Sequence, residues 1–180
     1  IFAWFANTFQ HQGIDVYINN AGLALPAPLL TSKTSGWRTM MDVHVIGLSV
    51  CTRETYQSMK ERKVDDGHII NINGMCGHRV LHNADVHFYN ATKYAVTALT
   101  EGLRQELREA KTHIRATVRS VSLVETELTY RLLSQNPKKA ACLQAAEIAN
   151  AVVYVLSAPP HVQNLSEIRI ITVLCWFVVM

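Results

Sequence analysis

Short apolar segments alternate with long segments of helical periodicity along this chain of 180 residues. The apolar segments lie at residues 14–19, 68–73, 115–121 and 168–174. Short, nearly continuous apolar runs are typical of strands that are buried on both faces of a parallel sheet. Strands that alternate with helices in this way predict the α/β class, and here a doubly wound parallel sheet of about four strands.

The segments between these strands carry the apolar pattern of amphipathic helices. The longest pattern follows Thr34 and runs through Trp37, Met41, Val45, Leu48, Cys51, Thr55 and Met59. A second helix is expected to begin near Phe88, and a third to span residues 147–156. Residues 127–140 are polar and uneven, which makes them a candidate substrate loop. The second helix is expected to bury Leu99, Leu103 and Leu107.

Composition narrows the classes of function. Apolar residues make up 49% of the chain and charged residues 17%, as in a single globular domain. The net charge of +3 comes from scattered basic residues, so no nucleic-acid partner is expected. The four cysteines form no Cys-x-x-Cys pair, which predicts a reducing, cytoplasmic setting and no metal site. The apolar run at 170–180 is about half as long as a membrane span, so no span is expected.

Two residues at the start of the helix near Phe88 could carry acid–base chemistry. Tyr89 and Lys93 are four residues apart, so their side chains lie on one helix face. A phenol has an ordinary pKa of about 10, and a neighbouring ammonium lowers that pKa because it favours the phenolate. The pair could therefore act as a general acid or base near neutral pH, although the same spacing also arises by chance in many helices.

Two further motifs stand upstream of this pair. One is Asn19-Asn20-Ala21-Gly22 at the end of the first predicted strand, and the other is Asn71-Ile72 followed by Gly77 after the second. In order and spacing, the three motifs resemble the short-chain dehydrogenase/reductase family, over about residues 13–158. The resemblance implies a partial Rossmann fold, NADP as cofactor, and a small-molecule ketone or steroid as substrate.

The resemblance also implies roles for particular residues. Tyr89 would give a proton to the substrate carbonyl, while Lys93 would lower the pKa of Tyr89 and hold the cofactor's ribose. Val124 and Thr126 match the two family positions that contact the nicotinamide carboxamide. The cofactor-binding residues would then be Asn20, Ala21, Gly22, Tyr89, Lys93, Val124 and Thr126.

Several family positions carry other residues here. The catalytic serine of the family falls on Gly74, which has no side-chain donor, and the thiol of Cys76 two residues on is only a weak donor. The family's asparagine on the long helix falls on His44. A lone histidine on a helix is more often structural than catalytic, and both interpretations stay open. The Pro-Gly pair expected after the strand at 115–121 is Val121-Ser122, which could misshape the nicotinamide pocket.

The sequence contains no Gly-rich strand-to-helix turn of the kind that cradles a pyrophosphate. We therefore expect residues 1–174 to form a single partial Rossmann domain, without the family's first strands, followed by an apolar tail at 175–180. The strand at 14–19 should then be a sheet edge. Because it has no Pro or Lys to discourage pairing, it is expected to support self-association, in addition to a family-type homo-oligomer.

Three hypotheses follow from the sequence. The chain could be an incomplete or impaired copy of an NADP-dependent carbonyl or keto-steroid reductase. It could be a catalytically inactive relative that serves as an interaction or structural partner. It could also be an unrelated α/β binding domain whose motifs match by chance. Binding of the dinucleotide would separate the first hypothesis from the second.

Overall fold

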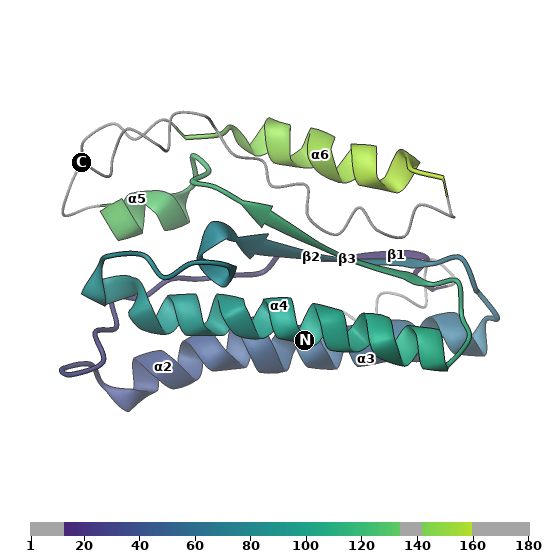
Figure 1. Cartoon of the computed structure of the whole chain (residues 1–180), viewed down its shortest axis with the longest axis horizontal. Coiled ribbons are helices and arrows are strands. Elements are labelled where there is room, and N and C mark those ends of the chain that lie inside the picture. The colour runs from purple at the N-terminus through teal and green to yellow at the C-terminus, as the bar shows by residue number, and fades with distance from the viewer. Residues whose placement is uncertain (1–12, 134–141, 160–180) are drawn as a thin grey trace.

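The computed structural model describes residues 13–133 and 142–159. Its centre is a parallel sheet with the strand order β1-β2-β3. Because the strands are parallel, their carboxyl ends all meet at one edge of the sheet (Figure 1). The strands are β1 (Val16–Asn19), β2 (His68–Gly74) and β3 (Arg115–Val121).

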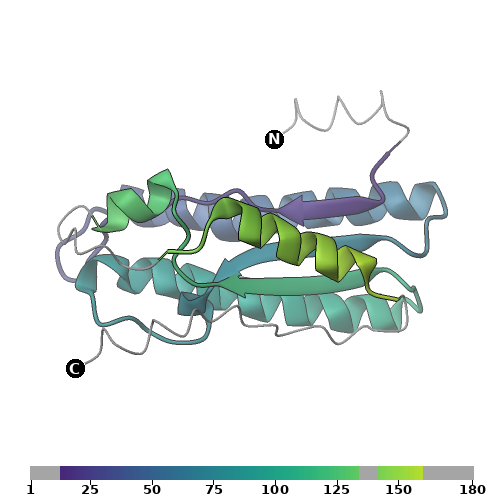
Figure 2. The same cartoon turned by 90° about the horizontal axis from the view of Figure 1, so that it is seen from above.

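Helices cover both faces of this sheet. Figures 1 and 2 show α3 and α4 on one face and α6 on the other, with α5 near the carboxyl edge. The doubly wound α/β fold expected from the sequence is confirmed. The helices are α2 (Thr34–Met41), α3 (Leu48–Glu61), α4 (His87–Glu109), α5 (Glu127–Leu133) and α6 (Ala145–Ser157). A π-helical turn, η2 (Asp42–Gly47), joins α2 to α3, and two short 3₁₀ turns are η3 (Met75–Gly77) and η4 (Ala84–Val86).

The strand β2 is buried on both faces, as its apolar sequence predicts. Ile69 is fully buried in a cluster with residues of α3, α4 and β3, whereas Ile70 packs against α6. Burying an aliphatic side chain of this size contributes about 1.5–3 kcal/mol relative to leaving it in water. These two clusters hold α3 and α4 against one face of the sheet and α6 against the other. They are Met59, Ile69, Leu107, Ile114 and Ala116 on one face, and Ile70, Val152 and Val155 on the other.

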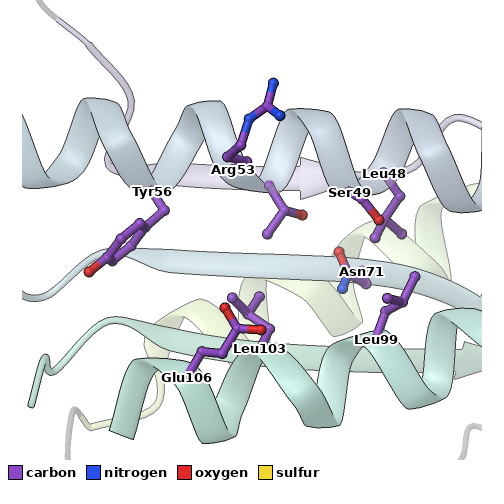
Figure 3. A pocket seen from close by; sticks show the side chains of 9 residues that line it. Leu48, Ser49, Arg53, Tyr56, Asn71, Leu99, Leu103 and Glu106 are labelled. Atoms are coloured by element: carbon purple, nitrogen blue, oxygen red, sulfur yellow. The ribbon is translucent and has the colours of Figure 1, made fainter. Parts of the chain in front are cut away.

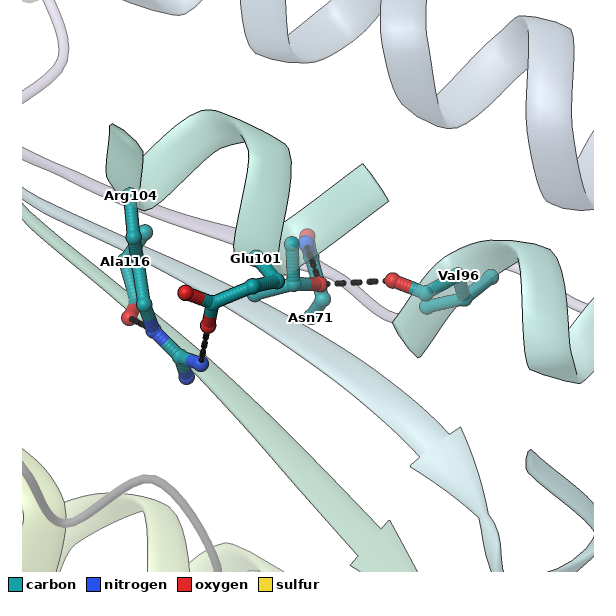
Figure 4. A network of polar contacts seen from close by, with 6 residues as sticks. Asn71, Val96, Glu101, Arg104 and Ala116 are labelled. Carbon is teal, nitrogen blue, oxygen red and sulfur yellow. Dashed lines mark hydrogen bonds and ion pairs between the residues drawn. The ribbon is translucent and has the colours of Figure 1, made fainter. Parts of the chain in front are cut away.

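A chain of side-chain hydrogen bonds crosses the buried face between the sheet and α4. The Asn19 amide donates to the Asn71 side-chain oxygen at 2.8 Å, and the Asn71 amide donates to the Thr100 hydroxyl at 2.9 Å. The Thr100 hydroxyl donates to the Val96 carbonyl at 2.8 Å. Figure 4 draws this contact as the dashed line that ends at Val96. Buried polar groups are costly unless they are paired, so this chain of bonds ties β1, β2 and α4 into one arrangement.

The strand boundaries agree with the sequence for β2 and β3, but β1 is shorter than the expected 14–19. The backbone carbonyl of Ile14 accepts a hydrogen bond from the Arg62 guanidinium instead of entering the sheet. The expected strand at 168–174 and the apolar tail at 175–180 lie outside the described residues. The expectation that residues 127–140 are a loop is wrong for the first half, because α5 covers residues 127–133.

The prediction that Leu99 is buried is also wrong, because its side chain is 37% exposed. Leu99 and Leu103 of α4 face α3 across an open groove of about 290 Å³. Figure 3 shows Asn71 of β2 at the floor of this groove, with Tyr56 on the side formed by α3, opposite the two leucines. Leu107 is 4% exposed and reaches the core as expected. The two helices therefore leave apolar surface open between them.

Arg119 of β3 is a buried charged residue. Arg119 is 2% exposed although the sequence places it awkwardly in a strand covered on both faces. It lies on the α6 side, beside its β2 partner Ile72. Burial lowers the pKa of Arg119, and Tyr154 of α6 opposes this shift. Within the two described ranges, we find no helix with the length and apolar character needed to cross a bilayer.

Candidate active site

Tyr89 lies at the carboxyl edge of the sheet, in the first turn of α4. Its side chain is buried, with 8% exposed. A Cβ atom placed on Gly74, the last residue of β2, would lie 3.9 Å from the Tyr89 hydroxyl oxygen. The turn η4 directs α4 to this point, and the Asn83 side chain closes that turn by accepting from the Asp85 backbone N–H. The sequence of turn and helix thus places the phenol beside the end of the central strand.

Lys93 lies one helical turn further along α4, against the face of the same ring. Its Nζ atom is 5.7 Å from the centroid of the Tyr89 ring, and only 7% of the residue is exposed. In the part of the chain that the structure describes, this ammonium has no hydrogen-bond partner. The Asn73 amide of β2 donates to the Lys93 backbone carbonyl at 3.1 Å and holds this turn of α4 against the sheet.

His44 connects three parts of the site from the π-helical turn η2. The Leu23 backbone N–H donates to His44 Nε2 at 3.1 Å, and His44 Nδ1 lies 2.8 Å from the Thr92 hydroxyl. The imidazole also meets the Tyr89 ring edge-on, with 5.5 Å between the ring centroids. Both ring nitrogens are therefore engaged by the protein. The structure therefore favours the structural interpretation of His44 over a catalytic role.

Burial dominates the acid–base properties of these groups. It raises the pKa of the Tyr89 phenol, and the nearby Cys76 thiol raises it further. It lowers the pKa of Lys93, and it lowers the pKa of His44 to about 4, with the charge of Lys93 as a second cause. The expectation that the pKa of Tyr89 is lowered is therefore wrong for this structure, because burial raises this pKa and the charge of Lys93 is not among the causes of the shift.

Cys76 faces this site, which the sequence alone left undecided. Its Sγ atom lies 3.0 Å from the position that a Cβ on Gly74 would take. Burial raises the pKa of the thiol, while its own backbone N–H and the charges of Lys93 and Arg79 oppose that effect. The thiol is thus a side-chain group next to Gly74, the position onto which the resemblance places the family's serine.

The other predicted cofactor residues lie on segments that follow the strands. Asn20, Ala21 and Gly22 are exposed and come directly after β1. Val124 and Thr126 are partly buried after β3, where the Thr126 hydroxyl donates to the Val124 carbonyl at 3.4 Å. Since parallel strands end at one edge, these segments and the Tyr89 pair share the carboxyl side of the sheet. The described residues contain no group of three or more His, Cys, Asp or Glu arranged to hold a metal ion.

An apolar cluster surrounds the Tyr89 ring, and the sequence analysis missed it. Trp37 of α2 stacks on Phe88 of α4 with 5.3 Å between ring centroids. The cluster draws on loops and helices that are far apart in the sequence, so no local periodicity could have revealed it. Its partly buried members are Leu23, Leu25, Trp37, Cys76, Leu81, Phe88 and Leu128. The site thus combines a phenol, an ammonium and a thiol with mostly apolar surroundings.

Comparisons with known proteins agree with this arrangement. A profile described as short chain dehydrogenase matches residues 3–137. The chain is 68% identical to dehydrogenase/reductase SDR family member 11 of Gallus gallus, over 85% of this chain and 63% of that relative. It is 41% identical to farnesol dehydrogenase of Aedes aegypti, over 91% of this chain and 65% of that protein. The solved closed form of serine dehydrogenase complexed with NADP+ is 30% identical, with a TM-score of 0.73 over 87% of this chain and 68% of that one.

Proposed function

The chain belongs to the short-chain dehydrogenase family, and from this premise we propose that it works in an NAD(P)(H)-dependent oxidoreductase that reduces apolar ketones, keto-steroids among them. The family resemblance seen in the sequence motifs is confirmed. The chain spans 63% of the length of the Gallus gallus relative, so the activity, substrate and partners of the whole protein are part of the proposal.

The observation that carries the proposal is the buried phenol of Tyr89 beside the end of β2. In the reductive direction the carbonyl oxygen gains a proton as the carbonyl carbon gains a hydride. A phenol is protonated at neutral pH, and burial raises the pKa of Tyr89 further, so the proton is in place for transfer to the carbonyl oxygen. His44 and Thr92 fix the turn that carries Tyr89, because the Thr92 hydroxyl donates to the Tyr89 carbonyl at 2.7 Å.

NADP(H) is the proposed cofactor, and when it is bound it supplies the hydride. Lys93 fits such a ligand, because its ammonium is a donor without a hydrogen-bond partner among the described residues, and ribose hydroxyls are suitable acceptors. The segments Asn20–Gly22 and Val124–Thr126 would border the cofactor from the ends of β1 and β3. We propose Tyr89 as the catalytic acid and Lys93 as its cofactor-binding neighbour.

The apolar cluster around Tyr89 supports an apolar substrate. The relatives' names differ on this point, since one refers to farnesol and one to serine. A charged amino-acid substrate would have to shed its water against Leu81, Phe88 and Leu128, and burying unpaired charge is costly. An aromatic or steroid ketone would instead bury apolar surface on these side chains.

A second candidate function is that of an inactive relative that serves as an interaction partner. Gly74 favours it, because the family's hydrogen-bond donor to the carbonyl is missing from that position. The open groove between α3 and α4 would offer an apolar surface to such a partner, a second copy of the chain included. The expected homo-oligomer and the cytoplasmic location stay predictions.

The experiment that tests the proposal adds a dinucleotide-binding segment in front of these 180 residues. We would join this chain behind the amino-terminal segment of the Gallus gallus relative and follow NADPH oxidation with an aromatic ketone or a keto-steroid. Tyr89→Phe should lower the rate by about 10²–10⁴, because it removes only the proton donor. Tyr94→Phe is the matched control, because Tyr94 lies on the same helix with 41% exposed. A fusion that binds NADPH but reduces nothing would favour the inactive relative.

A further inference from the structure

Cys76 occupies the space that a side chain at Gly74 would fill, and we propose that its thiol contacts the substrate carbonyl beside Tyr89. This inference rests on the proposed function and deepens it. It assigns a substrate contact to a residue that the family resemblance leaves without a role. It also accounts for the pairing of a glycine at the expected donor position with a thiol two residues later.

The backbone at Gly74 does not itself require glycine. Its φ of −118° and ψ of 162° belong to the extended region that any residue adopts. A Cβ atom at this position would meet the Cys76 Sγ at 3.0 Å, which is closer than ordinary packing. Its next neighbours, the Cys76 backbone nitrogen at 3.8 Å and the Tyr89 hydroxyl at 3.9 Å, are at normal contact distance. The thiol is therefore the obstacle to a side chain at residue 74.

Lys93 independently indicates that a ligand enters this space. Only 7% of the residue is exposed, its Nζ atom lies over the Tyr89 ring, and the ammonium has no hydrogen-bond partner within residues 13–133 and 142–159. The Cys76 Sγ and the Tyr89 hydroxyl both lie within 4 Å of the Cβ position at Gly74, and the Lys93 Nζ lies 5.7 Å from the Tyr89 ring centroid, so thiol, phenol and ammonium border one space. The ammonium can therefore donate hydrogen bonds to a polar ligand that enters this space.

The thiol changes what this space can recognise. A thiol is a weaker donor than a hydroxyl and behaves largely as a small apolar group. Cys76 packs against the same apolar cluster around Tyr89 as Leu81, Phe88 and Leu128. Cys76 should therefore favour ketones with apolar substituents next to the carbonyl, and should disfavour substrates that present hydroxyl groups there.

The first test measures whether residues 74 and 76 compete for the same space. The thermal midpoints of unfolding are compared for the unsubstituted chain, Gly74→Ser, Cys76→Ala and the double variant. Gly74→Ser should lower the midpoint by about 4 °C in the presence of Cys76 and have little effect in the Cys76→Ala background. If Gly74→Ser alone does not fold, folding of the double variant is the expected rescue. An equal effect of Gly74→Ser in both backgrounds, or failure of both to fold, would overturn the proposal.

The second test measures contact with a ketone, using the same 180-residue chain. N-ethylmaleimide labels the cysteines with and without benzophenone, and mass spectrometry reads the labelling rate of each peptide. Benzophenone should slow labelling of Cys76 several-fold and leave the partly buried Cys51 and Cys142 unchanged. Equal labelling of Cys76 in both conditions overturns the contact, even where the first test shows competition. Benzophenone could protect Cys76 while the fusion binds NADP but reduces no ketone. That pair of results would refute the proposed function and leave the contact at Cys76 standing.

Discussion

His44 Nδ1 lies 2.8 Å from the hydroxyl of Thr92, and this contact fixes the protonation state of the imidazole. The Thr92 hydroxyl gives its own proton to the Tyr89 carbonyl, so it accepts from His44 Nδ1. A backbone N–H can only donate, so Nε2 accepts from Leu23. His44 is therefore neutral with its proton on Nδ1. A proton added to Nε2 would break the bond that holds the loop after β1.

The first prediction is that acid destabilises the chain through His44. Burial and then the charge of Lys93 lower its pKa to about 4, whereas an imidazole in an unfolded chain titrates near 6.5. The unfolded chain thus binds more protons between these pH values, and the free energy of unfolding falls as pH drops from about 6.5 to about 4. The full shift corresponds to about 3 kcal/mol. His68, whose pKa burial also lowers to about 4, should contribute in the same window.

Urea unfolding at a series of pH values checks this prediction. His44→Asn should reduce the dependence of the unfolding free energy on pH and also lower stability at neutral pH, because the Leu23 and Thr92 contacts are lost. His82→Asn is the control, since it removes an exposed imidazole from a loop without touching those partners. If the variant at His44 keeps the full pH dependence, the neutral imidazole is not the cause.

The second prediction concerns the hydrogen bond from Asn71 to Thr100. Thr100→Val keeps the side-chain shape but leaves the Asn71 amide, which is 1% exposed, without its acceptor. An unpaired buried donor costs about 1–3 kcal/mol of stability. Thr39→Val removes a similar helical hydroxyl at an exposed site of α2 and should stay within about 0.5 kcal/mol. Chemical denaturation measures both, and equal losses would show that the buried contact is not special.

The third prediction is that a polypeptide of these 180 residues alone has no measurable reductase activity. Its sequence contains no Gly-rich turn to hold the pyrophosphate of a dinucleotide. Loss of one preorganised donor at the Gly74 position would cost roughly a further 10²–10³ in rate, by analogy with an oxyanion donor. Calorimetry with NADPH and a turnover assay check the two parts separately. Steady reduction of a diketone or keto-steroid by the pure chain would contradict the prediction.

The sequence predicted those features that depend on local pattern. The strands β2 and β3 stand where the apolar runs place them, and α4 begins next to the motif that supplies Tyr89. The motifs also identified the family, because three short patterns in a fixed order are far more specific than any one of them. β1 begins after the expected start at residue 14, where the Ile14 carbonyl accepts from Arg62, a residue distant in the sequence.

The features that the sequence could not supply depend on contacts between distant residues. Nothing in the sequence around His44 reveals that Leu23 and Thr92 occupy both of its ring nitrogens. The exposure of Leu99 depends on how far α3 lies from α4, which helical periodicity does not report. The spacing of Tyr89 and Lys93 placed them on one face correctly, but the pKa of the phenol depends on burial, which only the folded structure provides.

The last prediction concerns association of the 180-residue chain through β1. Among the three described strands β1 is at an edge, and Val16 and Ile18 are 44% and 40% exposed on the α6 side. An apolar edge strand without Lys or Pro is a template for pairing with another chain. Val16→Lys should therefore reduce the association seen in sedimentation.

Two matched variants locate the contact. Val153→Lys places the same charge on α6, at a residue that is 63% exposed, and should leave association unchanged. Leu99→Lys places it in the groove between α3 and α4 and should weaken only a dimer formed through those helices. If only the Val16 variant loses the species larger than a dimer, the contact that forms those species lies at β1. A stable monomer of the unsubstituted chain, with slow amide exchange along 14–19, would rule out pairing through this strand.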